Sequence, residues 1–461
     1  MSTPKNYHWR IAGFYFFYYA FVGMFAPYWS LYLKSIHFDV IEIATLMSIQ
    51  PVMRMIAPSL WGWLADGGYD TVMRGIRCGN TRPAVPDETA GEATSHLTCP
   101  AKDAGQVIAY SHSTKPPTNG GQVAGYPAPE GSAPPSRSGT GKRLLVVQIA
   151  ATLSAVCYLG VFATNSFWGM FLVLGLMGFF WSASMPLVEA TTLTYLGKHS
   201  SHYGRIRSWG SIGFIVSVVG LGYAFDYIAI AWLLWAGVIC ELGILVFSRQ
   251  IPPTEVLAHH TDHQPIRQIV LQPRVLALFG ACFLMSVAHG PYYTFYSIYL
   301  VEHGYAKSAV GGLWALGVVC EIGVFFMMPW LVRRFGYTRI LLASFGAAIA
   351  RFMLIGWGVD FLSLLFIAQV LHAATFGAYH AASMGLVHEF FQGRHQSKGQ
   401  ALFGSLTYGA GGMLGGLASG PIWQHYGASV LYSCSAGAAL LGLLLVLWKL
   451  RYSGNTVGYA N

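Results

Sequence analysis

Long apolar runs recur along the whole chain, and each is about as long as a helix must be to cross a bilayer. That length is about 20 residues, because a helix rises about 1.5 Å per residue through a hydrocarbon core about 30 Å thick. The runs that meet this requirement are 10–33, 43–65, 144–163, 166–189, 206–226, 229–248, 275–300, 308–331, 338–357, 361–386, 399–422 and 428–449. We therefore expect an all-α membrane protein with twelve transmembrane helices.

The composition agrees with a membrane protein and argues against a soluble one. Hydrophobic residues make up 54% of the chain and charged residues 10%, whereas soluble domains carry about 25% charged residues. The formal net charge is +9. The basic residues are scattered singly between apolar runs, so a nucleic-acid partner is not indicated.

The placement of the basic residues predicts the orientation in the membrane. They occupy every second connection and both ends of the chain, whereas the opposite side holds only Lys34 and Lys307. Connections rich in Lys and Arg stay in the cytoplasm. Both termini are therefore expected to be cytoplasmic, in a multi-pass protein of a bacterial inner (cytoplasmic) membrane.

Two long polar connections interrupt the runs. The first, 67–143, is rich in Gly, Pro, Ser and Thr and has no apolar period, which predicts a disordered cytoplasmic insertion. Docking of a partner is the alternative interpretation. The second connection separates six runs from six and predicts two six-helix bundles. The expected parts are a first bundle, a linker, a second bundle and a tail, at 1–249, 250–273, 274–450 and 451–461.

The linker contains three histidines that could bind a metal ion. They are His259, His260 and His263. No carboxylate or Cys at ligand spacing completes a closed site around them. A solvated linker is the preferred interpretation, and no metal site is predicted.

Ionisable residues within the apolar runs are the strongest functional signal. A charge at the bilayer centre costs at least about 2.5–3.5 kcal/mol. Such residues must therefore face a polar cavity or one another. The candidates are Arg54, Glu189, Arg207, His289, Glu321, Arg351, His372 and His380.

The candidates in the first half of the chain suggest substrate binding. Arg54, in the middle of its run, could hold a substrate carboxylate, or it could form a structural pair with a buried Glu. Glu189 and Arg207 lie near the cytoplasmic ends of their runs. By position alone, they could also be interfacial side chains that extend to water.

The candidates in the second half suggest proton coupling. A Glu in an apolar site and a His near neutral pH can each take up and release a proton. Glu321, Arg351, His372 and His380 are predicted to serve this purpose, and a structural Glu321–Arg351 salt bridge is the alternative. His289 is instead a further candidate for substrate binding, because the adjacent Gly290 and Pro291 can open the helix locally.

Short motifs resemble the major facilitator superfamily of transporters. The sequence GWLAD at 62–66 resembles the front of that superfamily's cytoplasmic loop motif, in which Gly62 and Asp66 would serve conformational gating. The corresponding stretch 329–336 keeps Arg333 and Arg334 but has no Asp. The resemblance implies two helical bundles that rock about a central site.

Further motifs resemble the phenylpropionate permease branch, which is related to the lactose permease type. They are YGRIRSWG at 203–210, AHGPYY at 288–293, LWALGVV at 313–319 and QVLHAATF at 369–376. The spacing of Glu189 and Arg207 is similar to the acidic–basic pair that holds the sugar in lactose permease. The resemblance moves this pair from the interface into the cavity.

The resemblance also implies roles for the coupling candidates. Glu321, Arg351 and His372 resemble coupling residues of the lactose permease type. That type has a proton-carrying carboxylate where this chain has Thr375. The carrier must therefore be another group, with Glu321 first, then His372 and His289.

Together these features predict a secondary transporter that works by alternating access, and not an enzyme. The expected solute is a small organic molecule, with an aryl carboxylate such as a phenylpropionate-like acid as the first choice. Tyr292, Tyr293 and Trp314 could stack on its ring, although lipid-facing or packing aromatics would be ordinary. The expected partners are the lipid bilayer, the solute and protons. No cofactor is expected besides the proton gradient, and the protein is expected to be monomeric.

Several alternatives remain open at this stage. A sugar or nucleoside proton symporter and a drug or metabolite efflux carrier fit the same features. A membrane-embedded metalloenzyme would use His372, His380 and His388, although their spacing of eight is poor for joint ligation. A non-transporting sensor or assembly factor would bind a partner through 67–143.

Overall fold

The computed structural model describes residues 8–65, 138–197, 202–251 and 266–450, which form helices and contain no strand. The long helices of the first half are α1 (His8–Ser35), α2 (Val40–Ala65), α4 (Ser138–Leu159), α5 (Phe167–Leu196), α6 (Tyr203–Phe225) and α7 (Leu233–Ser248). The second half contains the short α8 (Arg267–Val270), α9 (Pro273–Glu302), α10 (Lys307–Trp357), α11 (Leu362–His372), α12 (Tyr379–Phe390), α13 (Gln396–Gly404) and α14 (Gly412–Lys449). Two π-helical segments lie between these, η4 (Ala373–Ala378) and η6 (Ser405–Gly411).

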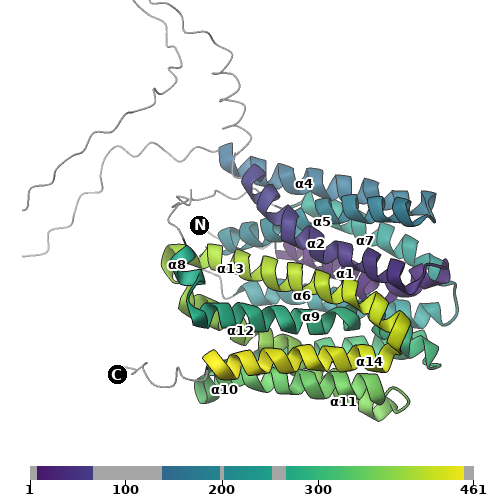
Figure 1. Ribbon diagram of the computed structural model, residues 1–461. Coiled ribbons are helices and arrows are strands. Elements are labelled where there is room, and N and C mark those ends of the chain that lie inside the picture. The colour runs from purple at the N-terminus through teal and green to yellow at the C-terminus, as the bar shows by residue number, and fades with distance from the viewer. Residues whose placement is uncertain (1–7, 66–137, 198–201, 252–265, 451–461) are drawn as a thin grey trace, which may run out of the picture.

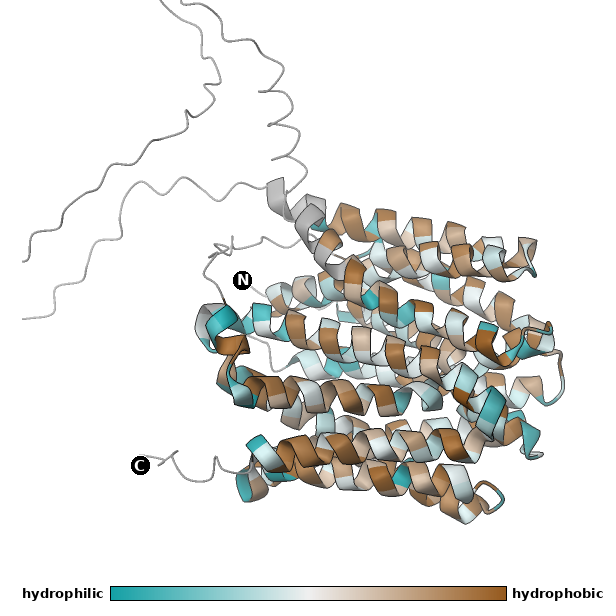
Figure 2. Cartoon of the chain, in the orientation of Figure 1, coloured by the Kyte–Doolittle hydropathy of each residue, from teal (hydrophilic) through white to brown (hydrophobic). Residues whose placement is uncertain are grey.

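The helices lie roughly side by side, as in a membrane protein (Figure 1). Ten helical stretches of the described residues are long and apolar enough to cross a bilayer. Apolar residues follow the lengths of the helices, and hydrophilic residues gather toward their two ends (Figure 2). A bilayer in contact with this surface accounts for the many exposed large side chains, such as Trp168 and Phe326.

The two longest stretches each consist of two helices joined at a glycine. Residues 307–357 contain Gly336 at φ 72°, and residues 396–449 contain Gly427 at φ 80°. A positive φ suits glycine and breaks an α-helix. Both glycines fall in the short gaps predicted between apolar runs, 331 to 338 and 422 to 428.

The insertion predicted at 67–143 lies outside the described residues, except for its last part. Residues 138–143 are helical and form the beginning of α4. The helix after the insertion therefore begins several residues before the predicted end of the insertion. An apolar run marks only the part of a helix inside the hydrocarbon, and the helix can continue beyond it because its backbone hydrogen bonds are internal.

Most packing occurs within each half of the chain. In the first half, α1 packs on α6 and α7, and α5 packs on α2 and α4. In the second half, α9 packs on α14, and α10 packs on α11 and α14. The halves meet chiefly through α2 with α14, α6 with α10, and α1 with α9. Residues close to both halves are therefore expected on these helices.

Glycine allows α1 and α6 to approach closely, and this gives a test of the packing. A Cβ added at Gly213 would lie 2.8 Å from the carbonyl carbon of Phe16, whereas one at Gly220 would meet open space. We expect Gly213→Val to destabilise the protein by about 1–3 kcal/mol, because a backbone must move. Thermal unfolding in detergent measures this. Gly220→Val is the control on the same helix, and equal melting temperatures for the two variants would refute the packing.

Candidate functional site

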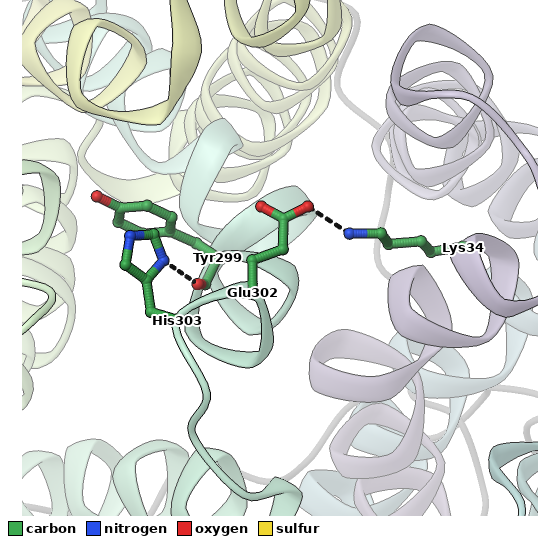
Figure 3. A network of polar contacts seen from close by, with 4 residues as sticks. All are labelled: Lys34, Tyr299, Glu302 and His303. Atoms are coloured by element: carbon green, nitrogen blue, oxygen red, sulfur yellow. Dashed lines mark hydrogen bonds and ion pairs between the residues drawn. The ribbon is translucent and has the colours of Figure 1, made fainter.

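Polar contacts join the two halves at one end of the molecule, which we call the Lys34 end. Lys34, near the end of α1, forms an ion pair with Glu302 at the end of α9 (Figure 3). Asp226, directly after α6, accepts a hydrogen bond of 2.8 Å from the backbone N–H of Lys307, and a further one from that of Ser308. The carboxylate thus caps the beginning of α10. These contacts hold surfaces of the two halves together.

Close backbone contacts reinforce this closure. A Cβ at Gly311 of α10 would lie 2.6 Å from the Tyr28 hydroxyl, which itself donates to the carbonyl of Val218 at 2.5 Å. A Cβ at Gly420 of α14 would lie 2.9 Å from the Cβ of Ala44 on α2. Small residues permit such approaches between membrane helices. The halves are in direct contact at this end.

The cap formed by Asp226 should depend on pH. Hydrogen bonds from the Ser308 side chain and from the backbone of Lys307 and Ser308 lower the pKa of Asp226, against a raising effect of desolvation. A lowered folded-state pKa means that the stabilisation is complete above the unfolded value of about 3.9 and is lost as pH falls through the folded value. We expect wild type and Asp226→Asn to differ in melting temperature at pH 7 and to converge below about pH 4. Melting curves that stay equally far apart down to about pH 3 would contradict this cap.

Arg54 lies between the two halves. Its side chain is exposed, and its guanidinium carbon lies 5.9 Å from the ring centre of Trp181 on α5. The Trp181 ring stacks on Tyr18 of α1 at 4.2 Å. The charge of Arg54 acts on Tyr18 and also on Tyr293 of α9, in the other half. An aromatic wall therefore borders a cation that has residues of both halves around it.

Glu189 and Arg207 do not pair with each other in this conformation. Arg207 donates a hydrogen bond to the Tyr19 hydroxyl, and its guanidinium carbon lies 4.0 Å from that ring centre. Glu189 accepts a hydrogen bond from the Tyr203 hydroxyl. Both charges act on Tyr15. Tyrosines thus occupy the positions that an ion pair between these side chains would use, and a ligand with hydroxyl groups could replace them.

Charged groups of both halves come within electrostatic range of one another. The charge of Arg207, on α6, acts on Glu321 of α10 and on His380 of α12. Glu321 is half-buried, and its carboxylate has no hydrogen-bond or ion-pair partner among the described residues. A Cβ at Gly377 would lie 2.9 Å from its Cγ, so a glycine in η4 makes room for it. We call Arg54, Arg207, Tyr293, Glu321 and His380 the inter-half cluster.

His380 also has a polar partner. Its Nδ1 lies 2.7 Å from the hydroxyl of Tyr408, in η6. The electrostatic influence of Glu321 reaches Tyr408 as well. His380, Tyr408 and Glu321 therefore form a group of titratable or hydroxyl side chains on α10, α12 and η6.

Arg351 and its neighbours form a second, fully buried group. The Arg351 Nη1 lies 3.2 Å from Nε2 of His289 and donates to Thr375 at 3.3 Å. His289 Nδ1 lies 2.8 Å from the Met285 carbonyl, which can only accept, so Nε2 of neutral His289 accepts from Arg351. His289 is thus fixed as a hydrogen-bond acceptor, which disfavours it as a proton carrier. Glu321 and Arg351 do not form the salt bridge that was the alternative interpretation.

Two of the three aromatics expected to stack on a ligand are packed within the protein. Tyr292 is 1% exposed and Trp314 is 4% exposed, with ring centres 4.7 Å apart. Trp314 Nε1 donates to Ser297 at 3.2 Å. Tyr293, the third, is partly exposed and is better placed to contact a ligand than either of them.

The remaining predicted residues divide into described and undescribed ones. Gly62 lies in α2, whereas Asp66 and the linker histidines lie outside the described residues. His372, His380 and His388 have different neighbours: His372 stacks on Phe376, His380 contacts Tyr408 and His388 contacts Gln400. Within the described ranges, no three His, Cys, Asp or Glu side chains are grouped as a metal site requires. The metalloenzyme alternative gains no support from this arrangement.

Sequence reasoning missed one buried carboxyl group. Glu241, in α7, is 1% exposed and accepts a hydrogen bond of 3.0 Å from Ser154 of α4. Its Oε2 has no partner among the described residues. The rule that selected Glu321, an ionisable residue inside an apolar run, applies equally to Glu241. The contributions of Tyr19, Tyr203 and Tyr408 were missed too, because tyrosines are common in membrane helices and give no distinct signal.

A separate hollow of about 640 Å³ lies at the beginnings of α1 and α6. Its lining includes Trp9, Phe17, Arg205 and Trp209. No residue of the inter-half cluster lines this hollow. The candidate site is therefore defined by the cluster and not by the hollow.

The chain is similar to known transporters in sequence and in fold. The chain is similar to the probable 3-phenylpropionic acid transporter of Escherichia coli (strain K12), with 28% identity over 62% of this chain and 77% of that protein. It is also similar to the maltose permease of Geobacillus stearothermophilus, with 23% identity over 66% and 76% of the two chains. A crystal structure of a mutant of the nucleoside transporter NupG matches 96% of this chain and 100% of that chain, with a TM-score of 0.72 and 14% identity, which shows the fold.

The sequence profile of the MFS_1 like family matches residues 8–73 and 137–434, which is most of the chain. The relatives named above are transporters. The predicted resemblance of this chain to the major facilitator superfamily is thereby confirmed. This chain belongs to the MFS_1 like family and is a multi-pass membrane transporter of the major facilitator superfamily.

Proposed function

We propose that this protein carries a small organic solute across a bacterial inner membrane by alternating access, coupled to protons. The single observation that supports this most is the inter-half cluster, because Arg207 of one half acts on Glu321 and His380 of the other. Charges in a membrane protein mark solute and proton pathways. Transporters of this architecture bind solute near the midplane, between two repeats.

The proposed topology has twelve spans, with both termini in the cytoplasm. Dividing the two longest stretches at Gly336 and Gly427 turns ten candidate spans into twelve. The proposed bundles are 1–249 and 274–450, joined by the linker 250–273 and followed by the tail 451–461. In this topology the Lys34 end faces outward. Its closure corresponds to a carrier that is closed to the outside.

The proposed solute is an aryl carboxylate. Arg54 supplies an exposed cation beside the Tyr18 and Trp181 rings, a combination that suits an aromatic acid. Similarity to a probable 3-phenylpropionic acid transporter points to the same class. Nucleosides are the second candidate, since Glu189 and Arg207 hold tyrosine hydroxyls that a ribose could replace. We propose that the protein acts as a monomer, without a cofactor and without catalysis.

The proposed proton carrier is Glu321. Its carboxylate has no fixed partner among the described residues, lies within range of Arg207 and is half-buried. A carboxyl group so placed can be neutral in one conformation and charged in another. Arg207 would favour the charged form when the two halves approach each other.

Binding of candidate solutes to the purified protein tests the proposed site. A thermal-shift screen should include 3-phenylpropionate, uridine and maltose, followed by uptake of any hit into proteoliposomes. We expect Arg54→Gln to weaken binding of an aryl carboxylate, and Arg207→Gln to weaken binding of a nucleoside, each at least about tenfold through loss of a charge-assisted contact. Arg205→Gln is the matched control, two residues away on the same helix. Equal affinity in wild type, Arg54→Gln and Arg207→Gln would remove the assigned site, and absence of flux for every hit would remove the transport proposal.

A further inference from the structure

A buried cation in α10 has no counter-charge among the described residues. The Arg351 side chain is 0% exposed. No carboxylate among the described residues lies within ion-pair distance of it. An uncompensated charge away from water is strongly unfavourable, and proteins normally pair such a group. The position therefore requires a negative charge that the described chain does not supply.

The hydrogen bonds of Arg351 leave one nitrogen free. The Nε donates to the Ala368 carbonyl at 3.2 Å, and Nη1 uses its two hydrogens on His289 and Thr375. A guanidinium has five N–H donors. The two on Nη2 have no acceptor among the described residues. A pair of free N–H groups on a cation is the usual arrangement for binding an anion.

The surroundings of Arg351 offer donors but no negative charge. Its guanidinium carbon lies 4.2 Å from the ring centre of Tyr292, and the Tyr292 hydroxyl donates to Oε1 of Gln369 at 3.1 Å. The Nε2 of Gln369 and the Nδ1 of His372 are buried and have no described partner either. A bound water could accept a hydrogen bond here, but it could not neutralise the charge.

We propose that Nη2 of Arg351 binds a small monovalent anion, either the carboxylate of a transported solute or a chloride ion. The carboxylate arm of this inference rests on the proposed function, whereas the chloride arm does not. The site is distinct from Arg54, which is exposed and lies between the halves. Arg351 is enclosed by residues of the second half alone, from α9, α10, α11 and η4.

Entry of the anion requires a change of conformation, because the site is closed here. One of the segments around it is η4, a π-helix that begins directly after His372 and contains Thr375. π-helical segments are rare and are associated with functional sites, since their backbone can rearrange locally. An anion bound at Arg351 would be occluded in the present conformation and exchanged in another.

Thermal unfolding of the purified full chain tests the site. The buffer contains no chloride, and the probes are sodium chloride, 3-phenylpropionate and the uncharged 3-phenylpropanamide. We expect a saturable rise in Tm of about 3 °C with one of the anions at a hundredfold excess over its Kd, and none with the amide. A response to chloride identifies an inorganic anion. A response to 3-phenylpropionate alone identifies the solute carboxylate at Arg351 if Thr375→Asp removes it, because binding at Arg54 would survive that substitution.

Two substitutions at one position make the test specific. Thr375→Asp places a fixed carboxylate beside Arg351 and should abolish the Tm response to the anion. Thr375→Val has nearly the same shape without the charge and should keep it. A wild type that responds to neither anion, or a Thr375→Asp protein with the full response, would overturn the inference.

The outcomes separate this inference from the proposed function. Uptake of uridine by proteoliposomes, together with a Tm that no anion changes, would refute the anion site and leave transport standing. A chloride response that only Thr375→Asp removes, in a protein that moves no tested solute, would support the site and refute transport.

Discussion

Glu321→Gln should abolish accumulation of the solute driven by a pH gradient while leaving solute exchange intact. One proton carried per solute across a gradient of one pH unit supplies about 1.4 kcal/mol, which corresponds to a tenfold concentration ratio. Gln resembles the protonated carboxyl group and cannot release a proton. Exchange of internal for external solute does not require that release, so it should continue. The accumulation ratio should therefore fall from about 10 to about 1.

The measurement uses proteoliposomes with an imposed pH gradient and labelled solute. Protein-free liposomes correct for passive entry of the neutral acid, which is needed if the solute is a carboxylic acid. Glu389→Gln is a matched control, because Glu389 lies at the end of α12, away from the inter-half cluster. Accumulation that persists in Glu321→Gln would move the proton site to another group, with His380 next because Arg207 acts on it as well.

Gly311→Val should open the Lys34 end. A Cβ at this position would lie 2.6 Å from the Tyr28 hydroxyl and closer still to the Val218 backbone, so α6 and α10 would have to separate. Overpacking of this kind costs about 2 kcal/mol. Because the cost falls on the closed form only, it shifts the balance between closed and open forms by about 30-fold.

Labelling of an introduced cysteine reports this shift. Ser48 of α2 is 2% exposed and lies beside Gly416 of α14, so Ser48→Cys in a background without other cysteines is shielded while this end is closed. We expect this cysteine to react with a maleimide at least about tenfold faster when Gly311→Val is also present. This factor is smaller than the expected change of about 30-fold in the balance between closed and open forms. Gly312→Val is the control, because a Cβ at Gly312 would meet open space. Equal labelling rates for the two variants would show that the α6–α10 contact does not control access.

The charges within the apolar runs show what the sequence could predict about the candidate site. Arg207 and Glu321 are charged residues within apolar runs and lie more than a hundred positions apart in the sequence. The structure brings them within electrostatic range of each other. The cost of a charge in lipid is enough to predict that each must have a polar environment. That cost does not predict which group provides the polar environment. Glu189 and Arg207 were expected to pair, but Arg207 bonds to Tyr19 and Glu189 to Tyr203.

The Lys34 end shows the opposite situation. Lys34 and Lys307 were informative in the sequence only as the few basic residues on one side of the membrane. In the structure Lys34 pairs with Glu302, and the backbone of Lys307 is bound by Asp226. Exposed charges near helix ends are so common that no sequence pattern distinguishes those that join two halves.

The amino-acid sequence by itself determined the class of protein, the positions of the apolar helices and the set of intramembrane charges. These follow from local quantities: the length of an apolar run and the energetic cost of a charge in hydrocarbon. Only the tertiary structure decided that Arg207 acts on Glu321, that Arg351 has no counter-charge among the described residues, and that the halves meet at the Lys34 end. Those outcomes depend on which helices approach each other, and that is decided by the packing of small residues such as Gly311 and Gly420 across many positions at once.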